Sequence, residues 1–241
     1  MLLGEPDPTQ ADLHFRIFGF PVRVSPYFWV GVLILKLSGG HEVDPEDAAI
    51  WVAVVFVSIL VHELGHAFLQ RRFGGHPWIT LYGFGGLASC GDCNPRPRAQ
   101  IIIALAGPFA GFLFAALIVL LLAVGGHLVA LQLSWQIIDW IAFESNYVNM
   151  AVDDLLYVNI WWGIINLLPV YPLDGGRVSR QLFLVRNSHT GIFRSLQLSA
   201  IIGSLVAAYA LWGRNYYLCF MFGYLAYGSF QAAKAEQEPW R

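Results

Sequence analysis

Long apolar runs separated by short polar segments dominate the sequence. An apolar helix needs about 20 residues to cross the hydrocarbon core of a bilayer. Four stretches of about this length contain no charged residue: 99–124, 155–173, 195–213 and 215–233. Residues 47–70 form a fifth candidate that is apolar except for three clustered ionisable side chains, and residues 24–40 form a weaker sixth. We therefore expect about six transmembrane helices.

The remaining segments are short. Residues 13–24 alternate apolar and basic side chains around Gly19, Phe20 and Pro21, a pattern that predicts a hairpin at the membrane surface. The first ten residues lack the basic start of a signal peptide and are interpreted as a polar tail.

The expected fold class is an all-α polytopic membrane protein with one integral-membrane domain over residues 1–241. It comprises a cytoplasmic tail and surface hairpin (1–23), a transmembrane core (24–235) and a C-terminal tail (236–241).

Composition supports the membrane assignment. The chain is 57% hydrophobic and only 12% charged, whereas soluble domains are about 25% charged. The net charge of −2, without a basic run, argues against a nucleic-acid partner. Three cysteines are too few for a disulfide framework. We expect Cys90 and Cys93 to be free thiols in a cytoplasmic loop rather than a redox pair.

The basic residues orient the chain. With six spans, both termini lie on one side, which then holds twelve of the fourteen basic residues, leaving Lys36 and Arg214 on the other. The twelve are Arg16, Arg23, Arg71, Arg72, Arg96, Arg98, Arg177, Arg180, Arg186, Arg194, Lys234 and Arg241. Because Lys and Arg are enriched in cytoplasmic loops, we expect both termini to be cytoplasmic. The small size and the absence of targeting signals favour a prokaryotic cytoplasmic membrane.

The ionisable cluster in the fifth candidate span has the pattern H-E-x-x-H. His62 and His66 lie four residues apart, so a helix places both imidazoles on one face, with Glu63 beside them. Two such histidines bind zinc, and the glutamate acts as the general base of a metalloprotease. Ionisable groups inside a membrane span are costly and mark functional sites, which weakens the alternative of histidines that only bond neighbouring helices.

A third zinc ligand can be sought by elimination among the carboxylates. Most carboxylates lie in tails, in a cytoplasmic loop, or in loops on the opposite side of the membrane. Asp174 ends a predicted span at the depth of the histidines, in a segment broken by two prolines and two glycines. Such backbone at membrane depth is tolerated where it lines a wet cavity. The alternative is an ordinary Asp-Gly turn at the surface.

These motifs resemble those of the site-2 protease family, the intramembrane zinc metalloproteases. Residues 62–66 resemble its first motif, and residues 166–175 resemble its second, which supplies an aspartate as third ligand. Residues 81–86 resemble its glycine-rich re-entrant loop, and residues 106–108 resemble a motif of the next span. Asp174 follows Pro-Leu where the family often has Asn-Pro, and Gly111 stands where an asparagine is common.

The resemblance implies one Zn²⁺ per chain, held by His62, His66 and Asp174, and cleavage of transmembrane protein substrates by means of Glu63. It further implies substrate-binding roles for Asn166, Phe84, Gly85 and Gly86. For Asn166 the alternative is interhelical hydrogen bonding, and for the three loop residues it is a plain cytoplasmic turn. The chain is expected to be a minimal member without the PDZ or CBS domains of larger relatives.

Two other functions remain open. In a proton- or cation-coupled transporter, His62, Glu63 and Asp174 would line an ion path, but the sequence has no inverted repeat. A non-proteolytic zinc-binding membrane scaffold would have no need of Glu63.

Overall fold

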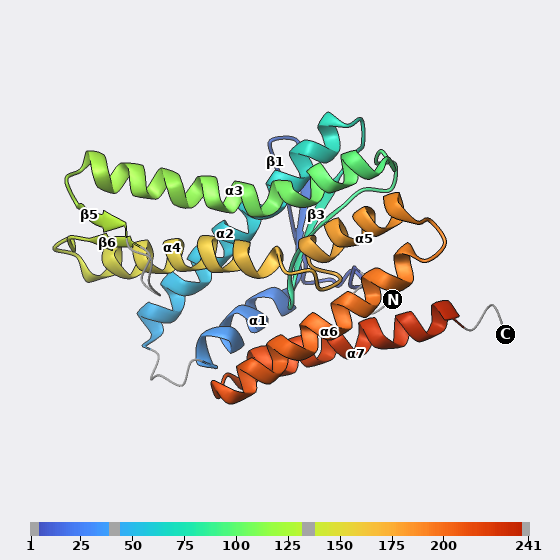
Figure 1. Cartoon of the computed structure of the whole chain (residues 1–241). Coiled ribbons are helices and arrows are strands. Elements are labelled where there is room, and N and C mark those ends of the chain that lie inside the picture. The colour runs from blue at the N-terminus through green and yellow to red at the C-terminus, as the bar shows by residue number, and fades with distance from the viewer. Residues whose placement is uncertain (1–4, 39–43, 132–137, 238–241) are drawn as a thin grey trace.

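The computed structural model describes residues 5–38, 44–131 and 138–237, which are mostly helical (Figure 1). The helices are α1 (Pro26–Leu37), α2 (Pro45–Arg72), α3 (Pro97–Val124), α4 (Asn146–Asn166), α5 (Asp174–Arg186), α6 (Gly191–Trp212) and α7 (Tyr216–Gln237). The strands are β1 (Leu13–Ile17), β2 (Phe20–Val24), β3 (Trp78–Tyr82), β4 (Gly85–Ser89), β5 (Leu128–Leu131) and β6 (Ile138–Trp140). The outer parts of the two predicted tails, residues 1–4 and 238–241, lie outside the described residues.

Among the described residues, three helices, α2, α3 and α6, are long and apolar enough to cross a membrane, and α1 is a shorter apolar helix. Helices α4 and α7 cover two further predicted spans but are not among these three. Large apolar side chains on α3 and α6 are largely exposed, for example Val124 (79% exposed) and Trp212 (83% exposed). Exposed apolar surface of this extent suits contact with lipid, and the chain is an integral membrane protein.

Local sequence fixes where the long helices begin. Helices α1, α2 and α3 each have proline in their first turn, where its missing N–H costs nothing. Helix α2 carries Glu46 and Asp47 in its first turn and Arg71 and Arg72 in its last. These charges complement the helix dipole. The H-E-x-x-H segment lies inside this continuous helix, away from both ends.

The all-α expectation was incomplete, because the described residues include a four-stranded sheet in the order β1-β2-β3-β4. The predicted hairpin over residues 13–24 is confirmed as the antiparallel pair β1–β2, and β2 pairs in parallel with β3. The glycine-rich segment forms a second antiparallel hairpin, β3–β4. A short pair, β5–β6, lies in the connection between α3 and α4.

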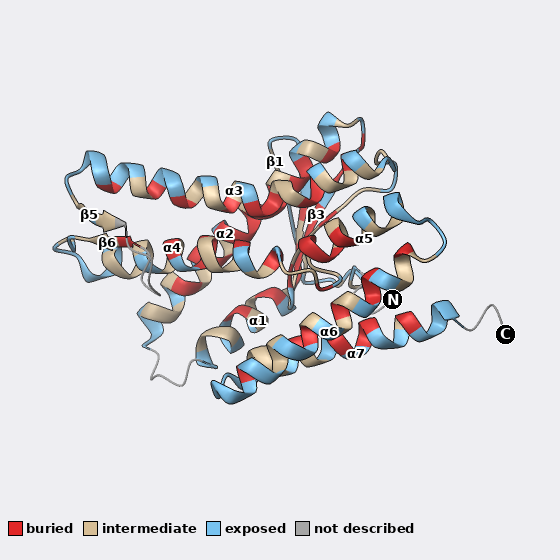
Figure 2. Cartoon of the chain, in the orientation of Figure 1, coloured by how far each residue is buried: buried red, intermediate tan, exposed pale blue. Residues whose placement is uncertain are grey.

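The centre of the molecule lies where this sheet meets α2 (Figures 1 and 2). Ile79 and Leu81 of β3 are fully buried there, packed in one cluster with residues of α1 and α2. Burial is concentrated where α2, α3 and α4 approach each other, while the outer faces of α3, α6 and α7 are exposed (Figure 2). Helices α6 and α7 run side by side as a hairpin (Figure 1).

The predicted span 155–173 ends earlier than expected. Helix α4 stops at Asn166, a turn follows, and Asp174 begins the separate helix α5. The prolines in this turn cannot continue a helix with full hydrogen bonding. Asp174 is therefore the first residue of a new helix rather than the end of a span.

Candidate metal centre

Helix α2 places His62 and His66 one turn apart and buries both, together with the neighbouring Glu63. Each of the three side chains is at most 5% exposed. Burial of three ionisable groups within an apolar helix is expensive unless they are paired or bind a metal. The histidines contact polar groups of α3 and α5, and Glu63 lies beside β4.

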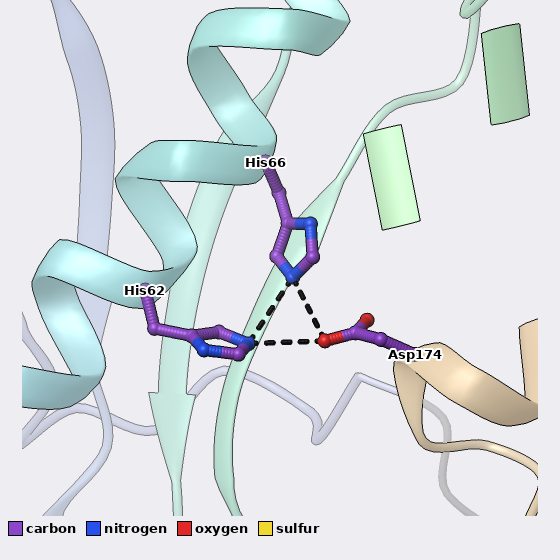
Figure 3. Close-up of side chains that lie close together, drawn as sticks. All are labelled: His62, His66 and Asp174. Carbon is purple, nitrogen blue, oxygen red and sulfur yellow. Dashed lines mark hydrogen bonds and ion pairs between the residues drawn. The ribbon is translucent and has the colours of Figure 1, made fainter. Parts of the chain in front are cut away.

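Asp174 reaches the histidines from the start of α5 (Figure 3). Its Oδ2 lies 3.1 Å from Nε2 of His62 and 3.3 Å from Nε2 of His66, and the two Nε2 atoms are 3.2 Å apart. Gly175 and Gly176 permit this approach, since a Cβ at either position would overlap backbone atoms of the preceding turn.

The three ligand atoms fit a tetrahedral metal site. Zinc–ligand bonds of about 2.0–2.1 Å give tetrahedral edges of about 3.3–3.4 Å, close to the 3.1–3.3 Å separations observed here. Within the described residues, His62, His66 and Asp174 are the one group of this kind whose donor atoms converge closely enough to hold a metal ion. Two imidazoles and a carboxylate are typical ligands of catalytic zinc.

A backbone hydrogen bond orients His66. Its Nδ1 lies 2.7 Å from the carbonyl oxygen of Ile103 in α3, so Nδ1 carries the proton and donates. In the neutral ring Nε2 is then left unprotonated and available to a metal. Metal-binding histidines usually donate their second ring nitrogen in this way.

Two glycines allow neighbouring elements to approach the charged side chains closely. A Cβ at Gly107 of α3 would overlap Nε2 of His66 and lie 2.6 Å from Nε2 of His62. A Cβ at Gly86 of β4 would overlap the side chain of Glu63, 2.6 Å from its Oε1. The centre therefore lies between α3 and β4, with no room for a side chain at either glycine.

The predicted substrate-binding residues surround the same space. Asn166 and Gly86 line one 310 Å³ cavity together with the ligands and Glu63, and Phe84 lines it as well. Gly85 faces Trp162 and lines a second cavity of 520 Å³. Asn166 donates through Nδ2 to the carbonyl oxygen of Trp162 in its own helix, at 2.9 Å, instead of bonding a neighbouring helix.

Several residues around this space were not singled out from the sequence. Gln70 is buried one turn beyond His66 and donates to the carbonyl oxygen of Ala88 in β4, at 3.0 Å. Tyr82 and Arg177 line the cavity that holds Glu63. The spacing of Gln70 from His66, again four residues, was the available signal for its place on the same helix face.

The expectation of free thiols at Cys90 and Cys93 is wrong, because the two cysteines form a disulfide. The loop after β4 brings their Cα atoms to 5.6 Å, which is within the normal range for a disulfide. His76 contacts Asp92 of this loop at 2.6 Å, and this hydrogen bond lowers the pKa of the Asp92 carboxyl.

A buried His-His-Asp group with an adjacent glutamate on an apolar helix defines a metal-dependent hydrolase centre of the H-E-x-x-H class. The chain belongs to Peptidase family M50, whose pattern matches residues 50–209.

The chain is similar to zinc metalloprotease MJ0392 of Methanocaldococcus jannaschii, with 27% identity over 80% of this chain and 50% of the relative. It is 34% identical to the putative zinc metalloprotease Rip3 of Mycobacterium tuberculosis, over 68% of this chain and 42% of the relative. The chain thus spans about half the length of the curated relatives it matches.

The fold matches that of a solved structure, the site-2 protease from Methanocaldococcus jannaschii. The TM-score is 0.58 at 24% identity, with 92% of this chain and 95% of the other covered.

Proposed function

We propose that this chain is an intramembrane zinc metalloprotease that hydrolyses peptide bonds in or near transmembrane segments of membrane proteins. The observation that carries the proposal is that His62, Glu63 and His66, on a helix apolar enough to span a bilayer, are buried and converge with the buried Asp174 of α5. Membership of Peptidase family M50, with relatives named zinc metalloproteases, supports it.

In this proposal His62, His66 and Asp174 hold one Zn²⁺ per chain. When bound, the ion supplies the Lewis acidity that activates water and polarises the scissile carbonyl. Glu63 accepts the proton of the attacking water and then donates it to the leaving amine. Burial of Glu63 lowers the local dielectric constant, which strengthens its electrostatic interactions with the reacting groups.

Strand β4 offers an edge for an extended substrate. In a two-residue hairpin, the pair next to the turn, here Tyr82 and Gly85, is hydrogen-bonded, and bonded pairs then alternate. Gly86 and Ala88 therefore direct their N–H and C=O groups away from β3. Gln70 donates to the carbonyl of Ala88. Gly86 lies beside Glu63, and we propose that its N–H and C=O groups pair with a substrate backbone.

The two cavities provide room for the substrate. The 310 Å³ cavity contains the metal ligands, and the 520 Å³ cavity extends from it toward α1 and the start of α2. They share Tyr82, Phe84, Trp162, Ile165, Tyr217 and Met221. A segment lying in the larger cavity would reach Glu63 past Phe84. We propose that it unwinds there and pairs with β4, while Asn166 contacts its backbone.

The proposed topology has six spans, a re-entrant β3–β4 hairpin and both termini in the cytoplasm, in a multi-pass protein of a prokaryotic cytoplasmic membrane. The apolar α2, α3 and α6 support this proposal, as does the asymmetric distribution of Lys and Arg. Residues 1–241 act as one domain in this proposal.

The test combines metal content with cleavage of single-span substrates. Glu63→Gln should retain zinc and lose cleavage, because the base is removed while the ligands remain. Asp174→Ala should lose or weaken zinc. Glu236→Gln, an exposed carboxylate change on α7, should alter neither.

Full cleavage by Glu63→Gln would reject the proposed mechanism. A parent chain that binds zinc but cleaves nothing would favour the scaffold. Ion flux in proteoliposomes that requires Glu63 would favour the transporter.

A further inference from the structure

Arg177 places a positive charge in the wall of the cavity that contains Glu63. The residue is half-buried, and among the described residues its guanidinium has no ion pair or hydrogen bond. Three other arginines have partners: Arg23 binds Glu5 and Asp12, and Arg71 donates to the carbonyl oxygen of Phe18. Arg180, one turn further along α5, lies over the ring of Tyr171 at 5.5 Å.

Helix stability does not account for this arginine. Arg177 lies in the first turn of α5, three residues after Asp174. Cations are unfavourable at helix N-termini, where the helix dipole is positive. The position instead places the Cα of Arg177 only about 4.5 Å along the helix axis from that of Asp174, at a rise of about 1.5 Å per residue.

The charges around the cavity leave Arg177 without a counter-ion. With Zn²⁺ bound, the two carboxylates of Glu63 and Asp174 are balanced by the ion. Most other residues of the wall are apolar or aromatic. A carboxylate is the group that pairs best with a guanidinium, often through two parallel hydrogen bonds.

We propose that Arg177 binds the side-chain carboxylate of an aspartate or glutamate in the substrate, close to the scissile bond. The inference rests on the proposed function and adds a substrate class to it: membrane segments with an acidic residue beside the cleavage site. Arg177 is a specificity-determining residue in this scheme, and Glu63 remains the base.

Binding can be measured separately from hydrolysis. The zinc-loaded full chain carrying Glu63→Gln is titrated with labelled single-span peptides that have a Leu-Ala core. One position at a time carries Glu, Gln or Lys. We expect the Glu peptide to bind about tenfold more tightly than its Gln counterpart at one or two positions, as for one charge-assisted pair.

Adding Arg177→Gln should abolish this preference, and Arg177→Glu should transfer it to the Lys peptide. The matched control Arg180→Gln should retain the preference for Glu. Zinc content and thermal unfolding show that each variant is folded. Equal affinity for Glu and Gln peptides at every position would overturn the inference. It would also be overturned if Arg177→Gln kept the preference, or weakened the binding of both peptides equally.

Hydrolysis of the same peptides by the parent chain separates a failure of this inference from a failure of the proposed function. Cleavage without any charge preference would reject the role of Arg177 and keep the protease. A charge preference in binding without any cleavage would support the role of Arg177 and reject the protease.

Discussion

We expect Gly107→Ala to weaken metal binding strongly while leaving the helix intact. The new Cβ would overlap Nε2 of His66 and lie 2.6 Å from Nε2 of His62, whereas ordinary contacts between heavy atoms are about 3.5–4.0 Å. One or both imidazoles must therefore move by roughly 1 Å. Zinc–ligand distances tolerate changes of only about 0.2 Å.

The expected loss of zinc affinity can be estimated from the effect of substitutions around other metal sites. Altering groups that only orient metal ligands typically costs about 10–100-fold in affinity, and displacing the ligands themselves should reach at least the upper end. At free zinc well above the Kd of the variant, a 100-fold loss of affinity removes about 2.7 kcal/mol of zinc-linked stabilisation. Helix propensity acts in the opposite direction, because alanine favours a helix over glycine by about 1 kcal/mol.

The assay is competition for zinc with a chelator, combined with thermal unfolding with and without zinc. Gly223→Ala is the matched control, since it makes the same substitution in helix α7 where nothing lies within 4 Å of the new Cβ. We expect the control to bind zinc like the parent and Gly107→Ala to lose most of the zinc-dependent rise in Tm. Unchanged zinc affinity in Gly107→Ala would refute the proposed ligand geometry.

Two further substitutions test Glu63 and strand β4 independently of metal binding. Gly86→Ala should push Glu63 from its place and lower the cleavage rate by about 100-fold or more, while zinc content measured by mass spectrometry stays at the parent level. A fully active Gly86→Ala would show that Glu63 does not work from this position. Gln70→Leu leaves the carbonyl of Ala88 without its buried donor, which should cost about 1–3 kcal/mol in thermal or denaturant unfolding. An unaltered unfolding midpoint would mean that water or another donor replaces Gln70.

The positions of the helices could be predicted from the sequence because charge-free runs and proline starts are local signals. The predicted stretch 99–124 corresponds to α3 (Pro97–Val124), and 195–213 corresponds to α6 (Gly191–Trp212). The stretch 155–173 matched less well, since apolar residues continue through the turn that separates α4 from Asp174. Hydrophobicity alone does not distinguish a helix from an apolar turn.

The sheet could not be predicted in the same way. Val22 pairs with Ile79, and Val24 pairs with Leu81, across more than fifty residues of chain that include α1 and α2. The alternating pattern at 13–24 predicted the local hairpin, which the structure confirms. Long-range pairing depends on how α2 folds back against the sheet, and single-sequence periodicity contains no signal for that. The sequence alone therefore predicts an all-α fold and misses the sheet.

Part of the candidate site could be predicted from the sequence, and part could not. His62, Glu63, His66 and Asp174 stand out because ionisable groups are rare in apolar helices and their chemistry is specific to residue type. Glycine has no chemistry of its own, so the importance of Gly107 at the site follows only from what lies beside it. Arg177 was counted in the sequence only as one of many basic residues that orient the chain.

The glycines also bear on how a membrane enzyme can hold polar groups in an apolar setting. Buried charges require partners at short range, because unpaired charges in a low-dielectric interior are expensive. Gly107 lets the backbone of α3 approach the imidazoles, and Gly86 lets β4 approach Glu63. Both contacts bring peptide groups, rather than apolar side chains, next to the candidate metal ligands and Glu63. In the proposed function, the edge of β4 beside Glu63 is where a substrate backbone replaces water as the hydrogen-bonding partner.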